Sequence, residues 1–105
     1  MRSPLKRELR QEPFRLDLHG AFIRRTDLSG ARLVGANLAN TDATGVNFRG
    51  ADFRDANLDG TILVGADLTD ARNLTERQLS RAVLDATTTL PDYVNRALLG
   101  QAAEE

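Results

Sequence analysis

The sequence has no cysteine and no tryptophan, and it contains only one histidine and three prolines. Without cysteine there are no disulfides and no thiolate metal ligands, and one histidine is too few for an all-protein zinc site. No stretch approaches the roughly 20 apolar residues of a membrane-spanning helix. The start, Met1 to Pro4, leads into a charged stretch without the apolar region of a signal peptide. We therefore expect a cytoplasmic protein that does not associate with membranes and needs no metal or cofactor.

The charges of the chain are nearly balanced, because 14 basic and 15 acidic residues give a net charge of −1. This balance lacks the electropositive footprint of a nucleic-acid-binding protein, so direct binding of nucleic acid is not expected. The 105 residues, of which 41% are hydrophobic, fit one small domain. These properties exclude several classes of function but select no partner.

Eleven consecutive five-residue repeats, or pentads, run from Leu16 to Asp70 without an insertion. The third residue of every pentad is apolar, and the first residue is small or β-branched except at Leu16. We expect the third residues to form the core, in which Ala43 fills the least space. The other ten are Leu18, Ile23, Leu28, Leu33, Leu38, Phe48, Phe53, Leu58, Leu63 and Leu68.

A five-residue period fits neither a helix nor a flat strand. An α-helix turns about 100° per residue, so the apolar residues would drift around it by roughly 140° per pentad. In a strand the side chains alternate between faces, so an odd repeat would send every second pentad's apolar residues to the opposite face. A corner in each pentad removes this conflict because it takes up the extra residue. Each pentad is therefore predicted to be one short side and one turn of a β-solenoid.

The other pentad positions have the composition of corners. The fifth residue is glycine in seven of the eleven pentads, and glycine accepts the positive φ of a tight turn. The second residue is Asp or Asn in eight pentads, and these short side chains can bond to nearby backbone amides. Local chemistry and the repeat period thus predict the same structure.

The motif A-(D/N)-L-x-x resembles the repeat of the pentapeptide-repeat proteins. It appears at 36–38, 51–53 (with Phe in the third place), 56–58 and 66–68. The resemblance implies an all-β solenoid, a right-handed quadrilateral β-helix with four pentads per coil and inward-pointing first and third residues. It also implies that helical caps follow the repeats. The eleven pentads would then make about 2.75 coils.

Three segments follow from this reading. Residues 1–15 are predicted to be an N-terminal cap or a flexible arm, residues 16–70 the β-helix, and residues 71–105 a C-terminal helical cap. Thr75 and Gln78 match a capping box, which predicts a helix from about 76 to 84. The face of this helix that should close the last coil carries Leu79, Ala82 and Val83.

A second C-terminal helix is predicted to start near Pro91, because proline is favoured in the first turn of a helix. The residues of its stripe are Leu90, Val94, Ala97, Leu98 and Gln101.

Four pentads per coil would stack residues whose numbers differ by twenty. Phe22 and Ile62 would then lie in one outward row with Asp42 between them. Val64 would lie in the neighbouring outward row, which also contains Arg24. Phe22, Ile62 and Val64 would form an exposed apolar patch that binds a protein partner or a second copy of the chain. The alternative is that the terminal segments fold over Phe22 and Ile62 and bury them.

Nothing in the sequence resembles a catalytic site. It shows no grouping of nucleophile, base and orienting residue, and no glycine motif for phosphates or dinucleotides. His19 has no acidic or nucleophilic neighbour at a useful spacing and is expected to be an ordinary surface residue. We therefore expect a non-enzymatic interaction or structural scaffold that serves an unidentified protein partner, or that forms a homodimer.

The resemblance also implies an alternative function, because some pentapeptide-repeat proteins mimic duplex DNA and bind DNA gyrase. Residues 16–70 hold eight carboxylates but also five arginines, which leaves a net charge of −3. Duplex DNA would carry about eight negative charges over the ~13 Å that the predicted coils span. The charge therefore favours the scaffold over the DNA mimic.

We predict that Leu58→Ala lowers the free energy of unfolding by about 2 to 5 kcal/mol, because it leaves a cavity in the central column. A thermal melt of the variant beside a surface control measures this. A shift no larger than that of the control would show that the third residues do not point inward.

Overall fold

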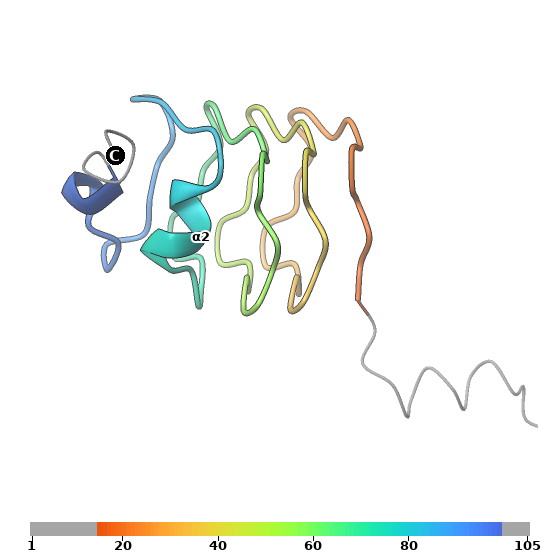
Figure 1. The fold of residues 1–105 in the computed structure, drawn as a ribbon, viewed down its shortest axis with the longest axis horizontal. Helices are drawn as coiled ribbons and strands as arrows, with labels where there is room; N and C mark the ends of the chain where they lie inside the picture. Colours follow the sequence, from red (N-terminus) through yellow and green to blue (C-terminus); the bar gives the residue numbers. More distant parts are fainter. Residues whose placement is uncertain (1–14, 100–105) are drawn as a thin grey trace, which may run out of the picture.

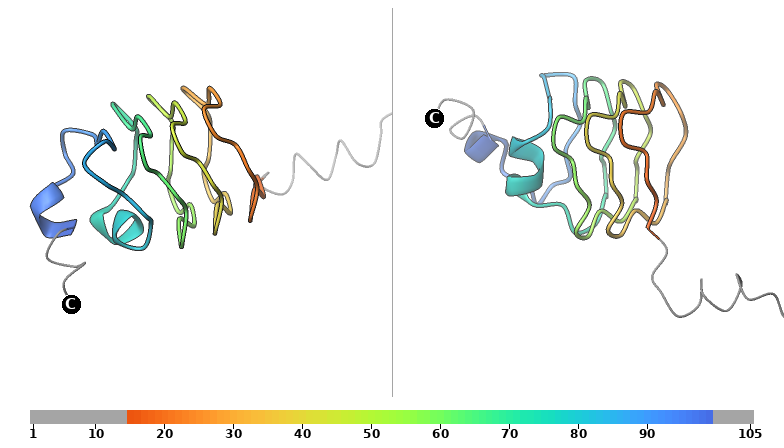
Figure 2. Two further views of the ribbon diagram at one scale, coloured as in Figure 1. Left: turned by 90° about the horizontal axis from the view of Figure 1, so that it is seen from above. Right: turned by 45° about the vertical axis from the view of Figure 1, so that its right-hand side comes forward.

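The computed structural model describes residues 15–99, which form a stack of coils with helical turns at its C-terminal end (Figure 1). The sides of the coils are short, and successive coils are joined by isolated parallel β-bridges. The helix α2 spans Glu76–Ser80. Figure 2 shows the coils one upon another, with α2 beside the last of them. Among the described residues, no helix is long and apolar enough to cross a membrane.

The bridges fix the register of the coils, because every bridge between residues 17 and 72 joins residues twenty apart. One row runs Asp17, Asn37, Asn57, and the second runs Phe22, Asp42, Ile62. The third row runs Asp27, Asn47, Asp67, and the fourth runs Arg32, Asp52, Arg72. Four rows at this step mean four pentads per coil.

Backbone hydrogen bonds run along the axis of the stack, from coil to coil. The amide of Leu38 donates to the carbonyl of Asn57 at 2.9 Å, and the amide of Asp42 donates back to the carbonyl of Ala21 at 2.8 Å. Equivalent bonds recur on the other faces. A second-position residue therefore directs both its N–H and its C=O toward the preceding coil.

The fifth residue of every pentad from Gly20 to Asp70 has a positive φ. Seven of these residues are glycines, and the other four, with φ between 58° and 60°, are Arg25, Asn40, Asp55 and Asp70. The second residue supports the corner, as where the amide of Ala39 donates to the Asn37 Oδ1 at 3.0 Å. The positive φ predicted for the corners is therefore present along the whole repeat, and the side-chain support is present where the second residue is Asp or Asn.

Seven of the ten predicted core side chains are at most 2% exposed, and they lie from Leu33 onward. The other three, Leu18, Ile23 and Leu28, belong to the first coil and are only partly buried. Ala43 is fully buried in the same coil as Phe48 and Phe53, whose rings pack edge to face at 5.2 Å. We infer that these two large rings fill the space that the small Ala43 leaves.

Two threonines at first positions, and Thr88 after the repeat, are buried among the apolar side chains. Thr41 and Thr61 are 0% exposed, and their hydroxyls donate at 2.6 Å to the carbonyls of Leu18 and Leu38. Thr88 donates in the same way to Leu63 at 2.8 Å. Burial of these hydroxyls is tolerated because each has a partner.

The capping box is present, but the helix that it starts is shorter than predicted. Thr75 accepts the amide of Gln78, and the Gln78 side chain accepts the amide of Thr75. The helix ends at Ser80, not near residue 84, and Val83 pairs with Ile62 while Thr89 pairs with Asp67. The chain leaves the helix because the last coil offers free backbone groups, which bond Val83 on both sides at 2.8 Å. The β-bridges therefore extend past residue 70, and the stack is longer than the predicted 2.75 coils.

The second predicted helix also differs, because the helical turn covers 96–99 and does not begin near Pro91. The amide of Val94 closes a turn onto the carbonyl of Pro91 at 3.1 Å, and the Asn95 side chain accepts the amide of Ala97 at 3.0 Å. Asn95 thus has the role of an N-cap. The apolar stripe predicted for this helix was correct for Val94, which is buried. It was wrong for Ala97 and Leu98, which are exposed, whereas Leu99 is buried. Gln101 and most of the predicted N-terminal cap lie outside the described residues.

Helix α2 takes the place of one side of the fourth coil. No β-bridge continues the row of Asn57 within the described residues. Instead, the Gln78 Nε2 donates to the carbonyls of Phe53 at 2.9 Å and Ala56 at 3.0 Å. One side-chain amide therefore gives the carbonyl of Ala56 a donor that a further coil would otherwise supply, and gives the carbonyl of Phe53 a second donor beside the amide of Ala56.

We predict that Gln78→Glu lowers the free energy of unfolding by about 1 to 3 kcal/mol, because it leaves the carbonyl of Ala56 without a donor and removes one of the two donors to the carbonyl of Phe53. The substitution keeps an oxygen that can accept the amide of Thr75, so it tests the contact with the coil and not the capping box. A denaturant titration beside Arg77→Ala, an exposed position on the same helix, measures the difference. Equal stability of the two variants would show that α2 is not held through this amide.

We predict that the protein loses stability as the pH falls below about 4. The Thr69 hydroxyl and amide, and also Arg49, hold the pKa of Asp67 below its usual value, and Thr44 does the same for Asp42. A carboxylate whose pKa is lower in the folded chain than in the unfolded chain, near ~3.9, stabilises the fold above that pH. This contribution disappears as the pH falls through the folded-state pKa.

Thermal melts between pH 7 and pH 2 test this prediction, with Asp67→Asn as the matched variant. Asparagine occupies the equivalent place at residue 47 and accepts the amide of Arg49 there at 3.0 Å. It cannot titrate, so the melting temperature of the variant should depend less on pH. An unchanged pH dependence would contradict the role given to Asp67.

Candidate interaction surface

One face of the stack carries the predicted apolar patch. Phe22, Asp42 and Ile62 are joined by β-bridges, and the row continues to Val83. Val64 lies two residues after Ile62, and its carbonyl accepts the amide of Gly45 at 2.9 Å. Ile62, Val64 and Val83, which we call the apolar cluster, therefore lie together on this face.

Exposure differs along the row. Phe22 is 79% exposed and Val83 is 48% exposed, whereas Ile62 and Val64 are half-buried. The described residues thus leave all four side chains accessible. Val83 was missed because it was assigned to the inner face of a helix. The signal that could have placed it is the run Ala82-Val83-Leu84, which repeats the first three pentad positions one residue late, 21 residues after Thr61 to Leu63.

An ion pair separates Phe22 from the apolar cluster. The Arg24 Nε lies 2.8 Å from the Asp42 Oδ2, and the Arg24 guanidinium lies 5.9 Å from the centre of the Phe22 ring. Asp42 is 8% exposed. The Thr44 hydroxyl, and then Arg24, lower the pKa of Asp42, so this carboxylate stays ionised. The face therefore presents an aromatic ring, a neutralised ion pair and an aliphatic cluster in that order along the axis.

Ion pairs also neutralise aspartates on the other faces. Arg49 pairs with Asp67 at 3.2 Å, in the same arrangement as Arg24 with Asp42. Two further aspartates pair with arginines farther along the chain, Asp59 with Arg81 at 2.6 Å and Asp52 with Arg72 at 4.0 Å. Acidic side chains therefore do not form an uninterrupted row on the described surface.

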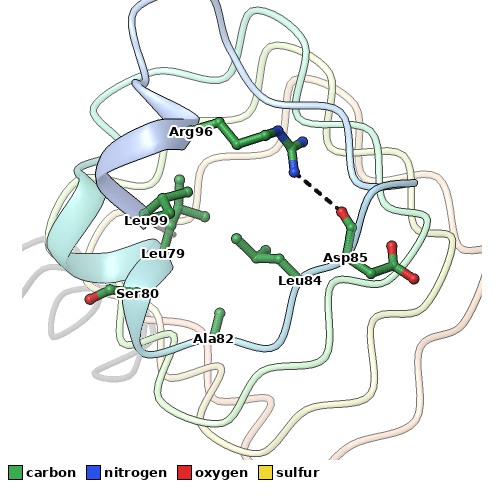
Figure 3. A pocket seen from close by; sticks show the side chains of 7 residues that line it. All are labelled: Leu79, Ser80, Ala82, Leu84, Asp85, Arg96 and Leu99. Carbon is green, nitrogen blue, oxygen red and sulfur yellow. Dashed lines mark hydrogen bonds between the residues drawn. The ribbon is translucent and has the colours of Figure 1, made fainter. Parts of the chain in front are cut away.

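A cavity of about 250 Å³ lies at the C-terminal end of the stack (Figure 3). Leu79, Leu84 and Leu99 line it, and Arg96 reaches across it toward the backbone of Asp85. The Arg96 guanidinium donates to the carbonyl of Asp85 at 3.3 Å and to that of Thr88. Arg96 thus has structural partners, and the carboxylate of Asp85, which also lines the cavity, accepts the amide of Thr87 at 2.8 Å.

The described residues contain no group of three or more His, Cys, Asp or Glu that could hold a metal ion. His19 is exposed on the first coil, where its amide donates to the Asp17 Oδ1 at 3.0 Å. Its place agrees with the sequence expectation of a surface residue.

Residues 31–70 match the family model of pentapeptide repeats, with eight copies of the repeat. The pentapeptide-repeat protein Rfr23 of the cyanobacterium Cyanothece 51142 is 26% identical, with a TM-score of 0.60, over 70% of this chain and 50% of that chain. HetL of Nostoc sp. strain PCC 7120, a pentapeptide-repeat protein involved in the regulation of heterocyst differentiation, is 29% identical, with a TM-score of 0.56. That match covers 72% of this chain and 35% of HetL. This chain therefore spans about half and about a third of these two relatives.

The plasmid-mediated fluoroquinolone resistance protein QnrB1 has a similar fold, with a TM-score of 0.61 over 85% of this chain and 41% of that chain. Its identity is 19%, so the likeness concerns the fold alone. No curated protein matches the chain. The repeat family and the solved structures agree with the four-sided register of the bridges. Residues 31–70 are therefore pentapeptide repeats, and the coils form a right-handed quadrilateral β-helix like those of the pentapeptide-repeat proteins.

Proposed function

We propose that the chain is a non-enzymatic interaction module that binds a protein partner through the face carrying Phe22 and the apolar cluster. The observation that carries this proposal is the exposure of Phe22 and Val83 on a row where the repeat family ordinarily places Asp or Asn. Neither side chain is needed for a corner. Exposed apolar side chains that gather on one face of a soluble scaffold are typical of binding surfaces.

The scaffold would present this surface at low entropic cost. The backbone of Ile62 is bonded twice to the preceding coil: its amide donates to the carbonyl of Thr41 at 2.9 Å, and its carbonyl accepts the amide of Ala43 at 2.9 Å. A partner would therefore meet side chains on a backbone that is already ordered. Such preorganisation strengthens binding because less conformational freedom is lost on association.

The chemistry of the described side chains supports a role without catalysis. Aspartates, whose carboxyl groups are suited to act as acids or bases, accept backbone amides at corners and turns, as Asp27 does from Ser29 and Asp85 from Thr87. The amide and hydroxyl of Ser29 lower the pKa of Asp27, and the hydroxyl and then the amide of Thr87 lower the pKa of Asp85. The lowered pKa favours the ionised form and opposes a role as a general acid near neutral pH.

The DNA-mimic function is the second candidate, and the ion pairs weigh against it. A surrogate for duplex DNA needs closely spaced negative charge. Asp42, Asp59 and Asp67 are each paired with an arginine within 3.2 Å. The resemblance of fold to QnrB1 adds no argument for shared targets at this level of identity.

We predict that a double variant, Ile62→Thr with Val64→Thr, loses a specific partner in affinity capture from a native cell extract. Threonine keeps the β-branched shape, so the coils should remain folded while the face becomes polar. Captured proteins are identified and quantified for the wild-type chain and the variant, after circular dichroism has shown equal folding.

The matched control is Val34→Thr beside Val64→Thr, because both are half-buried fourth-position valines that lie on different faces. A partner that is lost with Val64→Thr and kept with Val34→Thr supports the proposed face. Retention of every captured protein by the double variant would refute it. Gyrase as the captured protein would favour the DNA-mimic function instead.

A further inference from the structure

The first coil has an open edge, formed by the second-position residues Asp17, Phe22, Asp27 and Arg32. One coil later, the amide of Asn37 donates to Leu16 and its carbonyl accepts from Leu18, both at 2.8 Å. The same geometry in the first coil directs the corresponding groups out of the stack. Within residues 15–99, none of the backbone amides and carbonyls of the four edge residues has a hydrogen-bond partner.

Within residues 15–99, three apolar side chains at this edge are also incompletely covered. Leu18, Ile23 and Leu28 are only partly buried, whereas Leu38, Ala43 and Phe48, which stack on them, are 0% exposed. An edge that combines unpaired backbone groups with apolar side chains favours pairing with another chain. Three of the four edge residues are charged, so the charges decide which partner edge can pair with this one.

We propose that this edge pairs with the same edge of a second copy, so that two solenoids join at their N-terminal ends. A two-fold axis perpendicular to the stack reverses the chain direction, so the facing sides run antiparallel. Antiparallel strands contain pairs of opposite residues that exchange both N–H···O=C bonds. Each edge residue directs both its amide and its carbonyl out of the stack. It can therefore exchange two hydrogen bonds with the residue that lies opposite it.

The rise of the coil determines which sides of the two copies lie opposite one another. A coil climbs by one strand spacing, ~4.8 Å, so each side starts roughly 1.2 Å higher than the one before. The distance between the two facing copies is the same on all four sides only if the lowest side of each copy lies opposite the highest side of the other. The two middle sides then also lie opposite each other. Asp17 then lies opposite Arg32 of the second copy, and Phe22 lies opposite Asp27 of the second copy. Other two-fold arrangements leave gaps that differ by up to one strand spacing around the square.

The charges of the edge residues favour the same pairing of sides as the rise of the coil. Arg32 is the cation among the four edge residues, and the two-fold pairs it twice with Asp17. Neither side chain is in an ion pair among the described residues. Two opposite charges across the join favour this pairing, and like charges in the same places would oppose it.

Charge reversal in the full chain tests the join, measured by sedimentation velocity over a range of protein concentration. The wild-type chain is expected to show a monomer–dimer equilibrium. Asp17→Arg and Arg32→Asp should each weaken it at least about tenfold, because each variant places like charges opposite one another. An equimolar mixture of the two single variants should dimerise again, because both facing pairs then have opposite charges.

The matched control is Arg72→Asp, which makes the same change two coils away in the row of Arg32 and should leave the equilibrium unchanged. A wild-type chain that stays monomeric up to about 1 mM would overturn the proposal. So would single variants that dimerise like the wild type, or a mixture that forms no heterodimer. A monomer whose amides at the four edge residues are protected from hydrogen exchange would show that residues 1–14 cover the edge instead.

Discussion

The constraint on which the rest of the structure depends is the positive φ at the fifth residue of every pentad. This conformation turns the chain at each corner, and four such corners bring residues twenty apart into register. Glycine adopts it freely, and Asn and Asp tolerate it better than most residues. Arg25 adopts it at φ 58° without either advantage. We infer that the stack of coils imposes the corner geometry even where the local residue disfavours it.

Regular corners divide the side chains into two sets with different freedom. Inward residues must fill a narrow square, and the burial of Ala43 beside two phenylalanines shows that volumes are balanced within a coil. Outward residues meet no such requirement, so Phe22 and Ile62 can replace the usual Asp or Asn without loss of the bridge. Binding surfaces can therefore vary on this fold while the core stays fixed.

The repeat allowed the rows to be predicted from sequence, because a fixed step leaves no choice of register. Phe22 and Ile62 were placed in one row for this reason, and the bridges through Asp42 agree. Where the repeat ends, local signals fix only the start of an element. The capping box located the start of α2 correctly, but its end depends on free backbone groups at Thr61 and Leu63 that only the folded coil presents. Val83 therefore could not be placed from helix periodicity.

The two ends of the solenoid show how one physical requirement leads to different solutions. At the C-terminal end, open backbone groups are satisfied by the chain itself, through Gln78 and through Val83 and Thr89. At the N-terminal end, the described residues leave the equivalent groups of the first coil open. An edge of this kind needs a partner or a cover, because unpaired strand groups beside apolar side chains promote association. The backbone chemistry that makes α2 fold onto the last coil thus also makes the first coil a surface for another chain.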